Sequence, residues 1–296
     1  MYDLIIIGGG PAGLTAALYS LRANKKVLVI ESGVYGGQIV KAHKIENYPG
    51  IHSISGAEYA ISLYEQVKNL GAEFKSETVI HVNEDKTVIT NLSSYQAKAV
   101  IIATGAGYKK LQIDNEENFI GKGISYCATC DGNFFKNKTV AVVGGGDTAI
   151  KDAIYLSDIV KKLYVIHRRD SFRCEDKTLD ELKSKENVEF ILNSNVIKLN
   201  GDNLLESIEV KNNDGSISTI ELNGLFIAVG QEPKNGIFTN LVNIDKAGYI
   251  ESEDGVHTNV EGIYVAGDAR QKELRQLTTA VSDGSIAATI AIKEMK

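Results

Sequence analysis

The chain has 296 residues, of which 43% are apolar and 24% are charged, and its formal net charge is −6. This length favours two domains, each large enough for its own hydrophobic core. The negative charge leaves no broad basic surface, so we expect no nucleic-acid partner. No apolar run reaches the roughly 20 residues that a membrane-spanning helix needs, so we expect no membrane contact either.

The N-terminus and the cysteine content bear on the cellular compartment. Residues 1–3 lead directly into an apolar run without a basic segment or a cleavage site, so we expect no signal peptide. Three cysteines are too few for the disulfide framework of a small secreted protein. We therefore predict a cytoplasmic protein, in which a close cysteine pair is more often catalytic or metal-binding than structural.

Residues 3–33 form the first recognisable unit. An unbroken apolar run at 4–7 predicts a strand, a helix-periodic segment follows at 12–21, and a second, mostly apolar run covers 26–30. Continuous apolar strands that alternate with helices predict a parallel sheet covered on both faces.

The turn between the first strand and the helix carries Gly8, Gly10 and Gly13. In a dinucleotide-binding unit the first glycine permits a tight turn, the second lets the backbone approach a pyrophosphate, and the third allows close packing of helix and strand. The N-terminus of the helix then offers free N–H groups to the anion. Pro11 stands where the helix begins, at a position that needs no N–H donor.

The same unit occurs a second time in the chain. The first two glycines of the turn correspond without a gap to Gly144 and Gly146, and the third corresponds to Ala149. The predicted strand, helix and second strand of this repeat are residues 139–143, 149–156 and 162–166. Two copies in matching strand–turn–helix contexts predict two dinucleotide-binding units.

The two units differ at the end of their second strands. In the first unit the second strand ends at Glu31. This residue is placed to accept hydrogen bonds from a ribose hydroxyl, as in FAD or NAD sites. The matching position in the repeat is His167, followed by Arg168 and Arg169 and later by Arg173. Guanidinium groups bind a 2′-phosphate that a carboxylate would repel. We therefore expect the second unit to prefer NADPH to NADH.

Cys127 and Cys130 lie between the two units. A lone C-x-x-C pair can be a redox centre, half of a zinc site or an accident of sequence. Zinc needs four ligands, and Cys174 belongs to the second unit, so we expect no metal. Residues three apart in a helical turn lie on one face, at a spacing that a disulfide can bridge. Between two nucleotide-binding units, the pair suggests that electrons pass from one cofactor to another and leave through a dithiol.

Further motifs follow one another along the chain: Gly36-Gly37-Gln38, Glu46-Asn47-Tyr48-Pro49-Gly50, Ala103-Thr104-Gly105, Cys127 to Gly132, Gly267-Asp268 and Arg275-Gln276-Leu277. With the two glycine turns, they make the chain resemble the bacterial-type, low-molecular-weight thioredoxin reductases over essentially its whole length. The resemblance implies an α/β fold with two Rossmann-like domains, the second inserted in the first. It implies a discontinuous FAD domain at 1–110 and 238–296 and an NADPH domain at 111–237 that carries the cysteine pair.

The resemblance also implies which residues bind the cofactors. Those for FAD are Gly8, Gly10, Pro11, Ala12, Gly13, Glu31, Ser32, Gly36, Gly37, Gln38, Asn47, Ala103, Thr104, Gly105, Gly267, Asp268, Arg275, Gln276 and Leu277. Those for NADPH are Gly144, Gly146, Asp147, Thr148, His167, Arg168, Arg169 and Arg173. By the same analogy, Asp268 binds the ribityl chain or the pyrophosphate region of FAD.

The family pattern assigns different roles to the two sulfurs. Cys130 faces the flavin and receives electrons, Cys127 attacks the disulfide of the protein substrate, and Asp131 protonates the leaving thiolate. Electrons then pass from NADPH to FAD, to the cysteine pair and to thioredoxin. The resemblance further implies a homodimer, and a rotation of the NADPH domain between the two half-reactions about hinges near 105–107 and Gly236.

Two other functions fit the same motifs. One is a related flavin disulfide reductase that uses ferredoxin or another thiol partner, although an intact glycine turn and arginine cluster in the second unit argue against it. The other is a flavin- or nucleotide-binding sensor in which the cysteine pair acts as a redox switch without turnover. The chain departs from the family at Ile150-Lys151-Asp152 and at Cys174, where a more acidic helix start and a small residue are usual.

Overall fold

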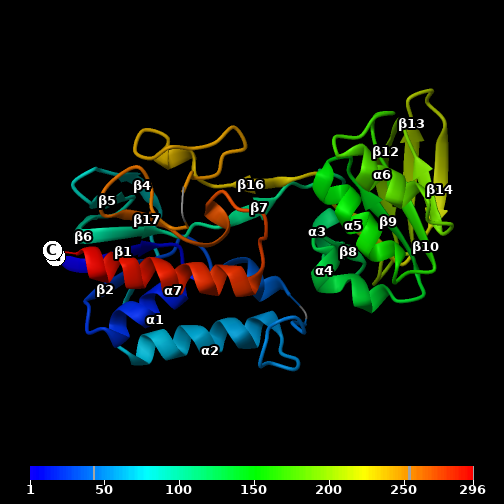
Figure 1. Cartoon of the computed structure of the whole chain (residues 1–296). Coiled ribbons are helices and arrows are strands. Elements are labelled where there is room, and N and C mark those ends of the chain that lie inside the picture. The colour runs from blue at the N-terminus through cyan, green and yellow to red at the C-terminus, as the bar shows by residue number, and fades with distance from the viewer. Residues whose placement is uncertain (43, 253–254, 296) are drawn as a thin grey trace. The chain divides into compact units, whose positions relative to one another are not determined.

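The computed structural model describes residues 1–42, 44–252 and 255–295. The chain divides into two compact units (Figure 1). Unit 1 consists of two separate segments, Met1–Gly107 and Glu232–Lys296. Unit 2 is the single segment Tyr108–Gln231, so the chain crosses between the units twice.

A seven-stranded sheet forms the centre of unit 1. β1 pairs in parallel with β2 and β6, β2 with β3, and β6 with β17, whereas β4, β5 and the start of β6 are antiparallel. The strands are β1 (Tyr2–Ile7), β2 (Val27–Ile30), β3 (Glu73–Lys75), β4 (Val79–Val82), β5 (Thr87–Thr90), β6 (Ser94–Ile102) and β17 (Ile263–Val265). In β1 the side chains of Leu4 and Ile6 pack into one hydrophobic cluster and those of Ile5 and Ile7 into another. Both faces of the strand are therefore buried, which explains its continuous apolar sequence.

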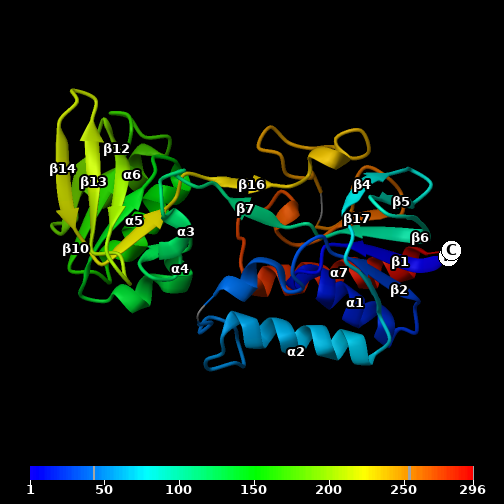
Figure 2. The ribbon, with the colours of Figure 1, turned by 180° about the vertical axis from the view of Figure 1, so that it is seen from behind.

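Three helices, α1 (Pro11–Arg22), α2 (Gly56–Asn69) and α7 (Leu277–Glu294), cover one face of this sheet (Figures 1 and 2). α1 begins at Pro11, where the fixed φ of proline suits the first turn. α2 begins with a capping box between Ser55 and Glu58. α1 and α7 pack closely, because a Cβ on Gly284 would lie 2.2 Å from the carbonyl oxygen of Ala12.

Unit 2 holds a five-stranded parallel sheet in the order β11-β10-β9-β15-β8 and a three-stranded antiparallel sheet in the order β12-β13-β14. The parallel strands are β8 (Ile124–Ser125), β9 (Thr139–Val143), β10 (Lys162–Ile166), β11 (Val188–Ile191) and β15 (Gly224–Ile227). The antiparallel strands are β12 (Ser194–Asn200), β13 (Ser207–Asn212) and β14 (Ile217–Glu221). The helices are α3 (Glu116–Phe119), α4 (Ala128–Asp131), α5 (Asp147–Ser157) and α6 (Asp176–Lys183).

The predicted repeat and the α/β fold are confirmed. The strands expected at 139–143 and 162–166 have those bounds in β9 and β10. α1 begins at Pro11, as the position of the proline predicts. α5 begins at Asp147, two residues before the expected start at 149, because the polar residues directly after the glycine turn already form the first helical turn.

Two short strands lie where the chain crosses between the units. β7 (Ala106–Tyr108) and β16 (Gln231–Pro233) pair with each other in a two-stranded sheet (Figure 2). Four 3-10 helices, η1 (Gly37–Lys41), η2 (Gly132–Phe135), η3 (Gly236–Phe238) and η4 (Gly267–Ala269), complete the regular structure of the described residues. No helix in this part of the chain is both long and apolar enough to cross a membrane.

Asn235 fixes the segment that follows β16. Its side chain is fully buried and accepts a hydrogen bond from the Thr104 hydroxyl at 3.1 Å. Its amide nitrogen donates to the carbonyl oxygens of Gly248 and Ala269, at 3.0 and 2.8 Å. One buried amide thus connects the end of β6 with two loops of the C-terminal segment.

We predict that Asn235→Ala lowers the free energy of unfolding by about 2 kcal/mol or more, because it removes a buried amide together with its hydrogen bonds to Thr104, Gly248 and Ala269. Urea denaturation followed by circular dichroism measures the change. Asn240→Ala, at an exposed asparagine five residues further on, is the matched control and is expected to change stability by less than about 0.5 kcal/mol. Equal losses for the two variants would contradict this account of Asn235.

Candidate active site

The first glycine turn leaves an open approach to the start of α1. A Cβ on Gly8 would lie 2.3 Å from the carbonyl oxygen of Ala103, and one on Gly13 would lie 1.9 Å from the carbonyl oxygen of Gly8. Gly10, the residue before α1, has no atom within 4 Å of its Cβ position. The turn is therefore closed on its inner side and open above the first N–H groups of the helix, which can receive an anion.

Two further predicted motifs reach the same place. The N–H of Gly36 donates to the carbonyl oxygen of Gly9 at 2.7 Å, and a Cβ on Gly37 would lie 3.2 Å from the Cα of Gly10. From the C-terminal segment, a Cβ on Gly267 would lie 2.7 Å from the Cβ of Ala12. Segments that are far apart in the sequence thus meet at one helix N-terminus.

Glu31 is held beside this turn. One carboxylate oxygen accepts the N–H of Gly9 at 2.7 Å, and the other accepts the N–H of Gly33, also at 2.7 Å. Each carboxylate oxygen can accept a second hydrogen bond, so the group can still receive hydroxyl donors. Ser32, directly after Glu31, and Gln38, directly after Gly37, are predicted to bind FAD, and both are exposed.

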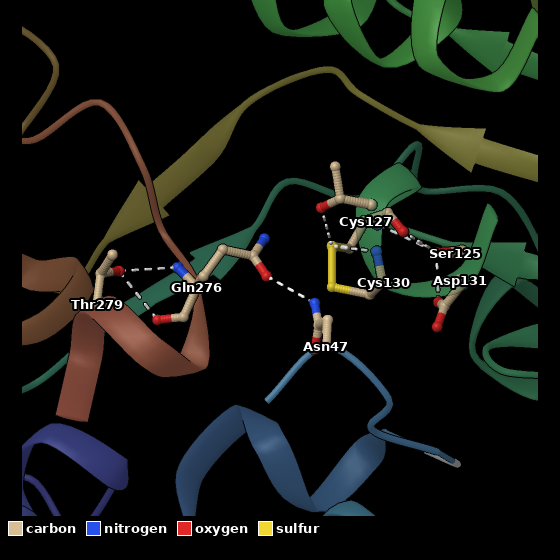
Figure 3. The surroundings of a disulfide bond; sticks show 8 residues. Asn47, Ser125, Cys127, Cys130, Asp131, Gln276 and Thr279 are labelled. Carbon is tan, nitrogen blue, oxygen red and sulfur yellow. Dashed lines mark hydrogen bonds between the residues drawn. A yellow bond between two sulfur atoms is a disulfide. The ribbon is translucent and has the colours of Figure 1, made fainter. Parts of the chain in front are cut away.

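Polar side chains gather around the start of α7. Asn47 donates to the side chain of Gln276 at 3.1 Å, and the N–H of Gln276 donates to the Thr279 hydroxyl at 3.1 Å (Figure 3). The guanidinium of Arg275 lies over the ring of Tyr249 at 3.8 Å. Its Nε is buried and has no hydrogen bond within the described residues. A buried donor of this kind is what a bound polar ligand would satisfy.

The second glycine turn, in unit 2, has the same construction. A Cβ on Gly144 would lie 2.4 Å from the carbonyl oxygen of Ala228, and Gly146 again has open space at its Cβ position. Gly145 packs directly against the imidazole of His167, where a Cβ would lie 2.1 Å from the ring. Asp147 and Thr148 occupy the first turn of α5, and Asp147 pairs with Lys151 at 2.7 Å in an exposed i, i+4 ion pair.

The predicted arginines lie beside this second turn. The N–H of Arg173 donates to the carbonyl oxygen of Gly145 at 2.8 Å. Arg168, Arg169 and Arg173 have exposed side chains, and none of them forms an ion pair with a carboxylate of the described chain. Burial first, and then these three charges, lower the pKa of His167, so its ring is mainly uncharged at neutral pH. The arrangement offers three uncompensated cations to an anionic ligand.

Cys127 and Cys130 form a disulfide across the first turn of α4, with their Cα atoms 5.3 Å apart (Figure 3). Cys127 is the residue before the helix, and its Sγ accepts the N–H of Cys130 at 3.2 Å. Ala128, between them, is buried in the cluster that contains Ala149 and Ala153 of α5. The disulfide is thus held on the core of unit 2, with Cys127 half-buried and Cys130 exposed.

The carboxylate of Asp131 is fixed within the same loop. The Ser125 hydroxyl donates to Asp131 Oδ2 at 2.6 Å, and the N–H of Cys127 donates to Ser125 Oγ at 3.1 Å (Figure 3). Ser125 therefore links the acid to the backbone of the cysteine. The third cysteine, Cys174, is unpaired and half-buried, and burial raises the pKa of its thiol. No cluster of three or more His, Cys, Asp or Glu side chains in the described chain could hold a metal ion.

Comparison with known proteins gives a consistent result over the whole chain. A family model described as pyridine nucleotide-disulphide oxidoreductase matches residues 2–284. The thioredoxin reductase of Bacillus subtilis (strain 168) is 43% identical and covers 97% of this chain and 93% of its own length. The structure of thioredoxin reductase from Streptococcus pyogenes MGAS5005 has 42% identity and a TM-score of 0.94, covering 99% of this chain and 98% of that one.

The chain belongs to the thioredoxin reductase family. The family resemblance and the pair of Rossmann-like folds inferred from the sequence are thereby confirmed. The family works with FAD and NADPH, so the two expected cofactors are also confirmed at the level of the family. A close cysteine pair that forms a disulfide fits the redox chemistry of thioredoxin reductases.

One residue near the cysteine pair of this thioredoxin reductase homologue escaped the sequence analysis. Glu116 is only 3% exposed, and its carboxylate accepts the N–H groups of Leu111 and Gln112 at 3.2 and 2.9 Å. It also accepts the hydroxyl of Tyr126 at 2.6 Å. The ring of Tyr126 stacks on Tyr108 at 5.1 Å, and both burial and Glu116 raise the pKa of the Tyr126 hydroxyl.

Glu116 therefore joins the first segment of unit 2 to the residue before Cys127. Its sequence context, Asn115-Glu116-Glu117-Asn118, is wholly polar and gives no sign of burial. Glu117, next to it, is exposed and forms a surface ion pair with Lys110. The two glutamates differ in environment although they are neighbours in sequence.

We predict that Glu116→Ala lowers the stability of unit 2 by about 2 kcal/mol or more, because two backbone N–H groups and a hydroxyl lose their acceptor. Glu117→Ala is the matched control, with an expected loss of less than about 1 kcal/mol, since exposed ion pairs contribute little. Urea denaturation and amide hydrogen exchange over 108–131 measure both. A Glu116→Ala variant as stable as Glu117→Ala would show that this network does not hold the segment.

Proposed function

We propose that this protein is an NADPH-dependent thioredoxin-disulfide reductase. Unit 1 binds FAD, and unit 2 binds NADPH and carries the redox-active Cys127–Cys130 pair. The observation that carries the proposal is this disulfide, held next to Asp131 in a chain with two open glycine turns. The names of relatives that match nearly the whole chain support the same activity.

The first turn fits FAD. The open position at Gly10 leaves room for a pyrophosphate over the start of α1, and the carboxylate of Glu31 has acceptor capacity for ribose hydroxyls. The buried Nε of Arg275 is a donor without a protein partner in the described chain, which a bound cofactor would satisfy. When bound, FAD supplies the capacity to accept hydride and to pass electrons to a disulfide.

The second turn fits NADPH. Its open position at Gly146 repeats that at Gly10, and the cations of Arg168, Arg169 and Arg173 suit the 2′-phosphate that distinguishes NADPH from NADH. The same arginines argue against a ferredoxin-fed reductase, which has no need of a 2′-phosphate site. Uncharged His167 provides a flat surface beside the turn.

The reduced cysteine pair can carry out thiol–disulfide exchange. The Cys127 thiolate attacks one sulfur of the thioredoxin disulfide, which forms a mixed disulfide and expels a thioredoxin thiolate. Asp131, in its protonated form, gives that thiolate a proton. Cys130 then attacks the Cys127 sulfur, releases the second thioredoxin thiol and restores the Cys127–Cys130 disulfide. The N–H of Cys130, aimed at Cys127 Sγ, stabilises the attacking thiolate and so supports this assignment of roles.

The cycle requires both NADPH and thioredoxin to gain access to their reaction partners. We propose that unit 2 rotates relative to unit 1 between the two half-reactions, with Gly105, in the left-handed region at φ 68°, and Gly236 among the hinge residues. The family supports a homodimer, and the need for NADPH and a dithiol partner supports a cytoplasmic location.

The decisive experiment uses Cys127→Ser in the FAD-loaded protein. We expect NADPH to bleach its flavin anaerobically as in the wild type, whereas thioredoxin reduction falls by about 10³-fold or more because the nucleophile is lost. Cys174→Ser is the matched control and should leave both steps unchanged. Survival of thioredoxin turnover in Cys127→Ser would refute the route. If reduced ferredoxin but not NADPH reduces the flavin of the wild-type protein, NADPH is not the electron donor. If NADPH reduces the flavin but thioredoxin is not turned over, the protein is a redox sensor and not a reductase.

The nucleotide preference gives a second prediction. Replacing Arg168, Arg169 and Arg173 by alanine should raise the KM for NADPH by roughly 100-fold, because each of these exposed cations contributes about 1 kcal/mol to binding of the phosphate. The KM for NADH should change little. Steady-state kinetics with both nucleotides measures the ratio, and Lys161→Ala, at the start of β10 and thus at the other end of the sheet, is the charge control. An equal rise in the KM for NADH would mean that the arginines do not recognise the 2′-phosphate.

A further inference from the structure

A network of buried charges lies behind the Gly267-Asp268 turn. The side chains of Lys272 and Asp283 are only 7% and 6% exposed, and Arg270 is 17% exposed. Buried lysines and aspartates occur almost only when they are paired. The role of this network is not explained by the packing of α7 alone, because its members come from the turn and loop as well as from the helix.

Asp283 of α7 organises the network. It accepts Nε and Nη2 of Arg270 at 2.9 and 3.1 Å, and the N–H of Gly267 at 3.1 Å. Lys272 Nζ donates to Asp283 Oδ2 at 3.0 Å. The ammonium also lies 3.2 Å from Asp268 Oδ1, an atom that is itself buried. Lys272 is thus the only cation of the described chain that forms ion pairs with both carboxylates.

The Gly267-Asp268 turn brings the Lys272–Asp268 ion pair to the start of α1. Gly267 packs against Ala12, so Asp268 is attached to the start of α1, where the proposed FAD pyrophosphate would add two negative charges. A carboxylate at that end of the helix opposes the phosphates unless a cation compensates it. Arg270 cannot do so directly, because both of its paired nitrogens bind Asp283.

We propose that Lys272 is a positioning residue for FAD: it balances the charge of Asp268 and fixes its carboxylate at the first glycine turn. This inference rests on the proposed binding of FAD by unit 1. It makes Lys272, which lies outside the motifs recognised in the sequence, a determinant of cofactor affinity and of the pH range over which FAD stays bound.

The charged groups around Asp268 determine how FAD binding changes with pH when Lys272 is removed. Burial raises the pKa of Asp268, and Lys272 and then Arg275 lower it, while Asp283 raises it. Tyr249 lies under Arg275, and the first turn of α1 contributes no acidic residue. Without Lys272, Asp268 faces Asp283 with less compensation, so its pKa rises further. The carboxyl then becomes neutral as the pH falls, and its repulsion of the phosphates is relieved.

The test measures FAD release from the diluted holoenzyme by the fluorescence of free FAD, at pH 8 and at pH 6 and at low salt. For Lys272→Met we expect about tenfold weaker FAD binding than in the wild type at pH 8. Most of this loss should disappear at pH 6. The double variant Lys272→Met/Asp283→Asn, which removes one charge of each sign, should recover most of the affinity at pH 8. Lys272→Arg should bind FAD nearly as the wild type does.

Lys293→Met, at the other end of α7, is the control for a change of the same charge and should leave FAD binding unaltered at both pH values. Wild-type affinity for Lys272→Met at pH 8 would overturn the inference. So would a loss that is the same at pH 6 and pH 8, or one that the double variant does not recover, since a purely structural role predicts both. Failure of the wild-type protein to bind FAD would instead refute the proposed function.

Discussion

The absence of a side chain at two glycine turns is the constraint on which the rest of this structure depends. At Gly8 and at Gly144 a Cβ would lie within 2.4 Å of the carbonyl oxygen of the residue that follows β6 or β15, so only a residue without a side chain fits there. Both residues also adopt positive φ, which L-amino acids rarely adopt. Each turn places the N-terminus of a helix at the carboxyl edge of a parallel sheet, next to an open glycine. The nucleotide-type sites of both units follow from this single arrangement.

The two units then diverge through charge. In unit 1 the end of β2 carries Glu31, which two backbone N–H groups hold in place. In unit 2 the equivalent strand end carries His167 and a loop of arginines whose backbone returns to the glycine turn at Gly145. In the function proposed above, the carboxylate would accept ribose hydroxyls and the guanidinium groups would bind a phosphate, so the same scaffold would select different ligands in the two units. The packing of the units can therefore stay alike while their chemistry differs.

Much of this could be predicted from sequence because the signals are local. The strands β9 and β10, the turn glycines, Pro11 and the spacing of the cysteine pair each depend on neighbours within a few residues. Asn235, Glu116 and Lys272 could not be found in this way. Asn235 is buried by partners 13 to 131 residues away. Glu116 and Lys272 bond nearer residues, but through loop conformations that no local sequence pattern indicates. All three stand in polar stretches that resemble exposed ones.

The redox loop shows how such distant support can matter for local chemistry. The disulfide spacing comes from one turn of α4, but α4 is too short to hold its own position in water. Ala128 anchors it to the core, Ser125 connects Asp131 to the backbone of Cys127, and Tyr126 connects the same strand end to Glu116. Because thiol–disulfide exchange needs the attacking sulfur and the acid at defined places, these contacts limit the freedom of both groups before a substrate arrives. The reactive turn is short, and its precision is supplied by the residues that surround it.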